Sequence, residues 1–333
     1  MARTRERGPA GVELRVALAA QLLLRDPVAT MTALAPVAQQ NEKDIPLMAS
    51  LAHLVGQQVL REVRPQFVSG GRRKIFNLSP FFNEYLLTKM RLHEMAEWVD
   101  YFVFVEAGQT YMGVDKPFNF EKFQDELQEF SSKIIYVKVE QIPTYLGSAW
   151  AREFYQRDMA VSALNGICGP DDLVLLTDAD ELVDGRAITY FNGSVSSLRM
   201  KVNKFFLNYQ PGKGNKYAYH RAGALCRADL LQKYGSSYIR FYLSGHRKDW
   251  HVLPHAGWHF TSINAPELIS QKFRNYSHQS QSKEIWRNEN RVAAFLDRLR
   301  AGDLEEGWTR AEIDEGLPGY IRQHQEELKD FLL

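Results

Sequence analysis

The sequence predicts an α/β protein with a mixed, mostly parallel sheet flanked by helices, preceded by a helical segment. From Lys74 onward, strand patterns alternate with helix patterns, as in a chain of βαβ units. Residues 101–105 are continuously apolar, which is typical of a strand buried on both faces. Residues 172–176 predict another buried strand, which leads directly into a cluster of acidic side chains.

The N-terminal part of the chain differs in composition from the rest. Residues 1–70 are rich in Ala, Leu, Val and Gln, and residues 13–25 and 47–63 within them have helix patterns. Residues 69–71 (Ser-Gly-Gly) have the composition of a linker. We therefore expect residues 1–70 to be a helical cap or an interaction segment, and residues 71–333 to be the main domain.

The main domain is expected to alternate strands with helices. The expected strands are residues 74–78, 101–105, 134–139 and 172–176. The expected helices are residues 84–97, 120–131 and 149–164. Glycines and a proline at 166, 169 and 170 end the last of these helices.

Composition excludes several classes of function. The 41 Lys and Arg residues nearly balance the 40 Asp and Glu residues, so no general basic field would attract nucleic acid. The two cysteines, Cys168 and Cys226, lack metal-ligand spacing. The early apolar run at residues 16–24 is too short to cross a bilayer, and we recognise no signal peptide. We expect a cytoplasmic protein without a transmembrane segment.

The most informative segment is residues 171–181, where an apolar strand ends in Asp178, Asp180 and Glu181. Ligands of open α/β sheets bind beyond the carboxyl ends of the strands. Clustered carboxylates resist joint ionisation unless a cation neutralises them. A hard cation with oxygen ligands, Mn²⁺ or Mg²⁺, is therefore expected here, bridging substrate phosphates. The alternative is a solvated acidic turn that caps a helix.

Several separated motifs, taken in order, resemble glycosyltransferase family 17, the family of the β-1,4-mannosyl-glycoprotein 4-β-N-acetylglucosaminyltransferases. The resemblance covers about residues 74–325. The matching segments are residues 81–84, 89–92, 99–106, 171–181, 257–260 and 317–321, with Thr110, Gly113, Lys116, Pro117, Ile269, Lys272, Ser277 and His278 between them. Leu182-Val183 departs from the usual family sequence.

The resemblance implies a GT-A-like fold, a UDP-sugar donor (UDP-N-acetylglucosamine) and inversion at the anomeric carbon. It also makes the acid cluster the holder of the metal and the diphosphate. Asp180 is the first candidate for a direct metal ligand, while Asp178 is expected to contact the ribose or a metal-bound water. His259 could be a second metal ligand or bond the diphosphate. Trp258 could stack on a sugar or base. Alternatively, both His259 and Trp258 could be residues of the hydrophobic core.

Four further residues are donor-binding candidates. Glu84 and Arg91, seven residues apart, lie on one predicted helix face, where the alternative is an internal salt link. Glu106 ends the second strand and could bind ribose or uridine, or be a hydrogen-bonded structural residue. Arg152 is preferred over Arg157 as the arginine that faces the diphosphate, because the two do not share a face.

The last assignments concern charge and proton transfer. Lys272 could neutralise the leaving phosphate, or simply decorate a helix. The general base is open among Glu181, Asp184 and Asp249. The acceptor is expected to be a glycan or a glycolipid, and a lipid-linked acceptor would bring peripheral membrane contact. Rival functions are another metal-dependent phosphate enzyme (a nucleotidyltransferase or a phosphohydrolase) and a non-catalytic binding module.

Overall fold

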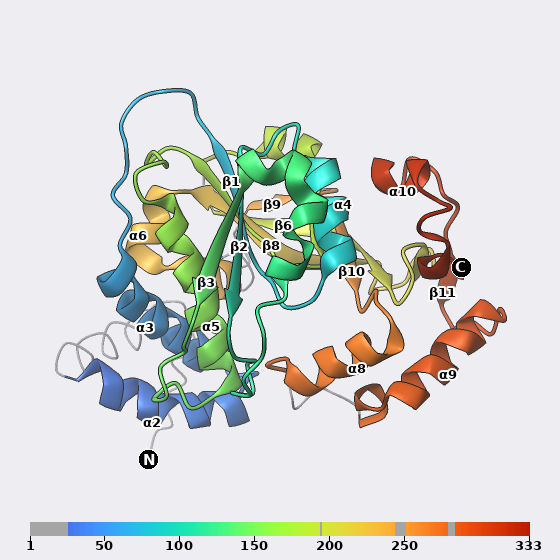
Figure 1. The fold of residues 1–333 in the computed structure, drawn as a ribbon, viewed down its shortest axis with the longest axis horizontal. Helices are drawn as coiled ribbons and strands as arrows, with labels where there is room; N and C mark the ends of the chain where they lie inside the picture. The colour runs from blue at the N-terminus through green and yellow to red at the C-terminus, as the bar shows by residue number, and fades with distance from the viewer. Residues whose placement is uncertain (1–25, 194, 244–250, 279–283) are drawn as a thin grey trace, which may run out of the picture.

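The computed structural model describes residues 26–193, 195–243, 251–278 and 284–333. These residues form one mixed nine-stranded sheet in the order β3-β2-β1-β4-β8-β6-β10-β5, with β9 beside β6 (Figure 1). Its strands are β1 (Ile75–Pro80), β2 (Tyr101–Ala107), β3 (Ile134–Val139), β4 (Leu173–Leu176), β5 (Glu181–Val183), β6 (Ser196–Lys204), β8 (Tyr219–Arg227), β9 (His251–Leu253) and β10 (Gly257–Thr261). A separate ribbon pairs β7 (Tyr209–Pro211) with β11 (Trp308–Arg310).

The sheet has a parallel half and a mixed half. Strands β3, β2, β1 and β4 are all parallel neighbours. Strand β8 is antiparallel to both β4 and β6, whereas β10 is parallel to β6 and antiparallel to β5. The expected class, an α/β fold with a mixed, mostly parallel sheet, is confirmed.

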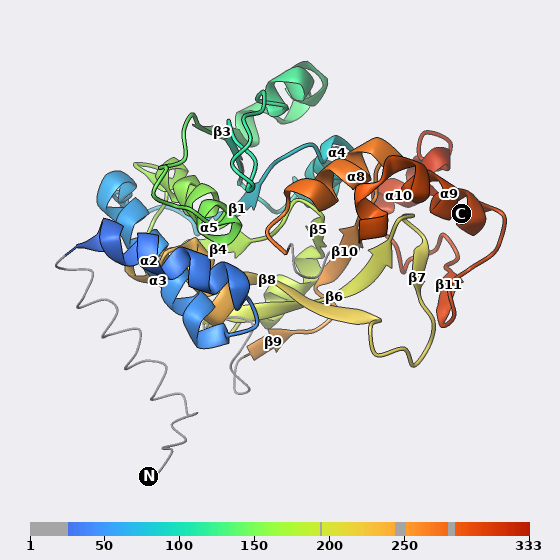
Figure 2. The same ribbon diagram turned by 90° about the horizontal axis from the view of Figure 1, so that it is seen from below.

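Helices gather in two groups at opposite ends of the molecule (Figure 2). At one end lie α2 (Pro27–Gln40), α3 (Ile45–Val63), α5 (Ala149–Met159), α6 (Asp229–Tyr234) and α7 (Ser236–Tyr238). At the other lie α4 (Tyr85–Met95), α8 (Pro266–Asn275), α9 (Glu289–Arg300) and α10 (Gly319–Gln323). No helix in the described part of the chain is both long and apolar enough to cross a bilayer.

The parallel strands are buried on both faces, as their apolar sequence predicts. Val103 and Val105 of β2 join a hydrophobic cluster that includes residues of α2, α3 and α5. Phe102 and Phe104, which point the other way, pack in a second cluster with residues of α4. The segment before residue 70 thus shares a core with the sheet, while the domain boundary at residue 71 stays a prediction.

Two expected helices differ from their prediction. The segment expected at residues 120–131 is a 3₁₀-helix, Phe120–Lys133, in which Leu127 has non-helical backbone angles and only Phe120 and Leu127 are buried. The helix expected at residues 149–164 ends at Met159 and continues as a 3₁₀ segment, Ala160–Leu164. The helix expected at residues 13–25 lies outside the described residues.

Candidate active site

A cavity of about 640 Å³ lies at the carboxyl ends of β1, β2 and β4. The segments that follow these strands supply Phe82, Tyr111 and the acidic segment 178–181 to its wall. Strands β8 and β10 and helix α8 contribute the opposite side, including His220, Arg221, His259 and Lys272. The acidic segment therefore lies at the ligand edge of the sheet, as expected.

Asp178 is held between two arginines. Arg157 of α5 donates from Nη2 to Oδ1 at 2.6 Å, and Arg240 donates from Nη2 to Oδ2. Burial by itself would raise the pKa of Asp178, but the two guanidinium groups outweigh it and lower that pKa below its usual range. Asp178 is therefore an anion that the protein itself neutralises.

Asp180 is buried and lies beside Lys272 and His259. The Lys272 ammonium lies 2.8 Å from Oδ2, and Nε2 of His259 lies 3.5 Å from Oδ1. Burial opposes ionisation, yet Lys272 and His259 hold the pKa of Asp180 well below its ordinary value. Burial lowers the pKa of His259, but the attraction of Asp180 exceeds this effect and raises it.

Glu181 begins β5 and has both carboxylate oxygens engaged. Arg240 donates to Oε1 at 2.8 Å and to Oε2 at 3.0 Å. The backbone N–H of Asp178 also donates to Oε2, at 2.8 Å. Glu181 therefore fixes the turn that carries the other two acids.

The close approach of β10 to β5 brings His259 to the acids. His259 pairs with Glu181 in the antiparallel register. Gly257, at φ +124°, makes this possible, because a Cβ at that position would lie 2.0 Å from the carbonyl oxygen of Leu182. The glycine of the motif at residues 257–260 (Gly-Trp-His-Phe) is thus the residue whose missing side chain lets β10 approach β5.

Successive residues of β10 face opposite sides of the sheet. His259 lines the cavity, whereas Trp258 packs in a hydrophobic cluster with residues such as Leu87 and Leu317 and donates from Nε1 to the carbonyl of Gly316 at 2.8 Å. Of the two interpretations left open for Trp258, core packing is the one that the structure supports. His259 carries a further feature, since its Nδ1 is buried without a hydrogen-bond partner among the described residues.

Glu84 and Arg91 do not share a face toward the cavity. Glu84 lines it and accepts at 3.1 Å from the backbone N–H groups of Phe82 and Asn83, just before α4 begins. Arg91 is completely buried behind the acids and donates to Asn77, to Thr177 and to the carbonyl of Asp178. Arg91 therefore supports the backbone of the acidic turn rather than the cavity wall.

Glu106 is a structural carboxylate. It is fully buried and accepts from the Lys116 ammonium, from the N–H groups of Asn119 (2.7 Å) and Phe120 (3.0 Å), and from the Tyr136 hydroxyl (2.8 Å). It does not line the cavity, but its partner Lys116 does. The hydrogen-bonded alternative thus describes Glu106, and Lys116 beside it is the residue of this pair that lines the cavity.

The structure places the two arginines of α5 on different faces of the helix, and neither is among the described residues that line the cavity. Arg157 meets Asp178 and also pairs with Glu153, one helical turn earlier, at 3.1 Å. Arg152 lies on another face of the helix and donates to the carbonyl of Tyr111 at 2.9 Å. Ser148 caps α5 through the N–H of Ala151 at 3.2 Å, which fixes where the helix begins and hence which face carries Arg157.

Of the remaining candidates for a general base, Asp184 does not line the cavity. Asp184 caps the 3₁₀ segment Gly185–Tyr190 and accepts from the N–H of Arg186 at 3.0 Å. Asp249 lies outside the described residues. Besides residues 178–181, Glu84 and Glu153 are the carboxylates of the described residues that line the cavity.

The donor atoms present fit a metal only in part. No three His, Cys, Asp or Glu residues of the described chain gather closely enough to hold an ion alone. Asp180 and His259 nevertheless form an oxygen–nitrogen pair, and Mg²⁺ and similar ions are commonly held by one or two protein groups with water and substrate phosphates completing the shell. The nitrogen of His259 that faces Asp180 is Nε2, 3.5 Å from Oδ1, so Nε2 is the atom that would share an ion with Asp180.

Comparisons with known proteins identify the family of this chain. The model of "Glycosyltransferase family 17" matches residues 62–298, and the chain belongs to this family. The membership confirms the resemblance seen in the sequence, and the sheet described above is the α/β, GT-A-like architecture that it implies.

Curated relatives include the β-1,4-mannosyl-glycoprotein 4-β-N-acetylglucosaminyltransferases of Homo sapiens and Rattus norvegicus. Each is 24% identical to this chain over 235 residues, which is 59% of this chain. The matched part is 42% of the human protein and 41% of the rat protein, so this chain matches less than half the length of these relatives.

Two solved structures are similar to this chain at lower sequence identity. The mannosyltransferase PcManGT from Pyrobaculum calidifontis, in complex with GDP-Man and Mn²⁺, is 14% identical with a TM-score of 0.35, covering 82% of this chain and 88% of its own. An active-site mutant of LgtC is 12% identical with a TM-score of 0.31, covering 78% of this chain and 95% of its own.

Proposed function

We propose that this glycosyltransferase moves N-acetylglucosamine from UDP-N-acetylglucosamine to a hydroxyl group of a glycan or glycolipid, with inversion. The observation that carries the proposal is the acidic turn 178–181, which lies with Lys272 and His259 in a cavity of about 640 Å³ at the carboxyl ends of parallel strands. The curated relatives are named for N-acetylglucosaminyl transfer, which supports the choice of sugar.

We propose that Asp180 and His259 hold Mn²⁺ or Mg²⁺ together with the donor diphosphate. A bound divalent ion would supply charge stabilisation as the bond to the leaving group breaks. The Lys272 ammonium could then pair with a phosphate oxygen of the donor instead of with Asp180. Asp178 and Glu181 contribute rigidity, since Arg157 and Arg240 occupy their oxygens.

The proton of the acceptor hydroxyl must be taken by a base. Glu181 was a candidate from the sequence, but its two oxygens accept from Arg240 and from a backbone N–H. Glu84 is a better placed carboxylate, because it lines the cavity and its hydrogen bonds to described residues, from the N–H groups of Phe82 and Asn83, engage only Oε2. We therefore propose Glu84 as the base to test first, by the pH dependence of kcat in Glu84→Gln.

Ligand-induced thermal shifts test the donor. The midpoint of unfolding is measured with UDP, UDP-N-acetylglucosamine, UDP-galactose and GDP-mannose, each with and without Mn²⁺. A ligand that binds only the folded state raises the midpoint, so we expect the largest metal-dependent rise with UDP-N-acetylglucosamine. Asp180→Asn should lose this rise, while Asp297→Asn, an exposed acid on α9, should keep it. A larger rise with GDP-mannose would overturn the donor assignment.

A further inference from the structure

Strand β3 (Ile134–Val139) forms one end of the nine-stranded sheet. It pairs with β2, and in the described part of the chain no strand lies along its outer side (Figure 1). Its sequence, Ile-Ile-Tyr-Val-Lys-Val, is nearly as apolar as that of a strand buried on both faces. An apolar strand at the edge of a sheet can pair with a strand of another chain.

The side chains of β3 are covered less completely than those of its neighbour. In β2 every residue but the first is buried, whereas in β3 only Val139 is buried and Lys138 is exposed. Ile135 and Val137 pack against one hydrophobic cluster and Tyr136 against the other, yet all three keep part of their surface in solvent. A further strand beside β3 would remove part of this apolar surface from water.

The hydrogen bonds of β3 show which of its backbone groups face outward. The carbonyl of Val139 accepts from the N–H of Gly108 at 2.9 Å, so Val139 directs its backbone groups toward β2. Because these directions alternate along a strand, Val137 does the same, while Tyr136 and Lys138 direct their N–H and C=O groups away from the sheet. Among the described residues, none forms a hydrogen bond with these outward groups.

The sequence of β3 is complementary to itself in one antiparallel register. If Tyr136 pairs with Lys138 of a second copy, and Lys138 with Tyr136 of that copy, the outward N–H and C=O groups of all these residues are satisfied. Val137 then faces Val137 of the second copy, and Ile135 faces Val139. Apolar, β-branched pairs of this kind stabilise a sheet.

A shift of the pairing by two residues in either direction is less favourable. In one direction, Lys138 would lie directly opposite Lys138 of the second copy, where like charges destabilise a sheet. In the other direction, Lys138 would pair with Ile134, whose N–H already donates to the carbonyl of Phe130. The charge and the occupied N–H group thus favour the register that is centred on Val137.

From these contacts we infer that β3 is a self-association surface, through which two copies of this chain pair antiparallel around Val137 and join their sheets. The same surface of each copy is used, so the assembly closes at two copies. No residue of β3 is among the described residues that line the main cavity, and the inference therefore does not depend on the proposed transferase function.

Cross-linking tests the register. In Val137→Cys the two introduced thiols would face each other, and the non-hydrogen-bonded position brings their Cα atoms to about 4.5 Å, within the range of a disulfide. With oxidised glutathione as the oxidant, we expect a covalent dimer. Ile135→Cys is the matched control, because it would face Val139 of the second copy and should give none. The natural cysteines, Cys168 and Cys226, are buried.

Sedimentation equilibrium of the full chain measures the association itself. We expect a reversible dimer, with a dissociation constant about tenfold or more higher in Lys138→Pro, because each copy loses an N–H donor to the other. Proline is tolerated where the N–H of an edge strand faces solvent. Lys138→Ala is the matched control, since it removes the same charge but keeps the N–H, and it should still dimerise. UDP affinity should be the same in both variants.

Three results would overturn the inference. The first is a chain that stays monomeric at concentrations up to about 100 µM, which excludes all but the weakest pairing. The second is a dimer that Lys138→Pro leaves unchanged, which would place the contact on another surface. The third is a disulfide in Ile135→Cys but not in Val137→Cys, which would contradict the register. Failure of UDP to bind would count against the proposed function alone.

Discussion

The ammonium of Lys272 lies 2.8 Å from Oδ2 of Asp180, joining residues 92 positions apart in the sequence. Helix α8 thus places a cation on the carboxylate that we propose as a metal ligand. An arriving metal ion must compete with this lysine, and an arriving phosphate must draw the lysine away. We therefore propose that the Lys272–Asp180 pair couples donor binding to metal binding.

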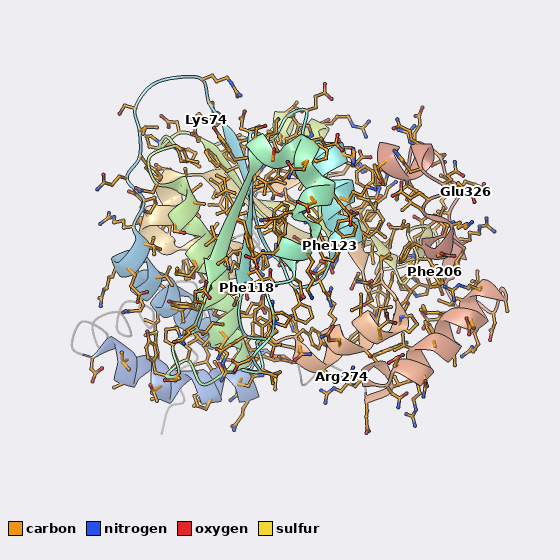
Figure 3. The ribbon with its side chains drawn as sticks, viewed as in Figure 1. Lys74, Phe118, Phe123, Phe206, Arg274 and Glu326 are labelled. Carbon is orange, nitrogen blue, oxygen red and sulfur yellow. The ribbon has the colours of Figure 1, made fainter. Side chains whose placement is uncertain are left out.

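Replacing Lys272 should separate these two binding events. In Lys272→Met, UDP affinity without metal should fall about tenfold because a phosphate partner is lost. The affinity for Mn²⁺ alone should rise, because no ammonium competes for Oδ2. Calorimetry measures both constants. Arg274→Met is the matched control, since Arg274 is exposed on the same helix, α8 (Figure 3), and is not among the cavity-lining residues. If the affinities for UDP and for Mn²⁺ are both unchanged in Lys272→Met, the lysine does not compete with the metal for Asp180.

Arg240 is expected to be essential for stability because it pairs with both Asp178 and Glu181. Arg240→Met leaves two carboxylates without this buried partner, which should reduce the free energy of unfolding by about 3–5 kcal/mol. Adding Glu181→Gln removes one of those charges and should restore part of the loss. Urea unfolding of the two single variants and the double variant measures the coupling, and strictly additive effects would contradict the described pair.

Neighbouring residues of β10 should respond in opposite ways to mutation. Trp258→Phe loses the hydrogen bond to Gly316 and should reduce the free energy of unfolding by about 1–3 kcal/mol, leaving Mn²⁺–UDP affinity unchanged. His259→Ala should weaken Mn²⁺–UDP binding about tenfold or more and change stability less. Denaturant unfolding and calorimetry give both quantities for each variant. If Trp258→Phe folds fully but binds Mn²⁺–UDP more weakly than the unmodified chain does, the indole of Trp258 would instead belong to the donor site.

Asp158 should make stability depend on pH. Burial raises its pKa from 3.8 to about 6, although hydrogen bonds from Ser236 and Ser237 act in the lowering direction. The folded state therefore binds this proton more tightly than the unfolded state does, and the contribution to stability is present below about pH 4 and lost as pH rises to about 6. Its size is about 3 kcal/mol.

Asp158→Asn isolates this contribution from those of the other carboxylates. The free energy of unfolding is measured for both proteins from about pH 4 to about pH 7. The difference between the unmodified chain and the variant should shift by about 3 kcal/mol in favour of the variant over this interval. A constant difference would show that Asp158 does not titrate as described.

The parallel half of the fold was predictable because its strands are nearly continuous apolar runs. The mixed half was not, since β5 has only three residues and β6 is mostly polar, with Arg199 exposed between the buried Leu198 and Met200. Two-residue alternation in a polar sequence is a weaker signal than a continuous run. The ribbon of β7 and β11, each three residues long, was also beyond prediction.

The acidic part of the site was predictable, but its cations were not. Asp178, Asp180 and Glu181 are adjacent to one strand, so their proximity follows from local sequence. Arg240 meets Glu181 across 59 residues, from a π-helical turn, and no spacing rule connects the two. For Arg157 a signal existed, because Glu153 stands one turn before it on the same helix face.

The most direct test of the proposed function is the binding of Mn²⁺ in the presence of UDP, followed by electron paramagnetic resonance. Free Mn²⁺ gives the solution signal, and binding to the protein removes it. Our account predicts that the unmodified chain takes up one Mn²⁺ per UDP and that Asp180→Asn, with a normal unfolding midpoint, takes up none at the same concentrations. Equal uptake by both proteins would contradict the assignment of Asp180, and no uptake by either would contradict the metal.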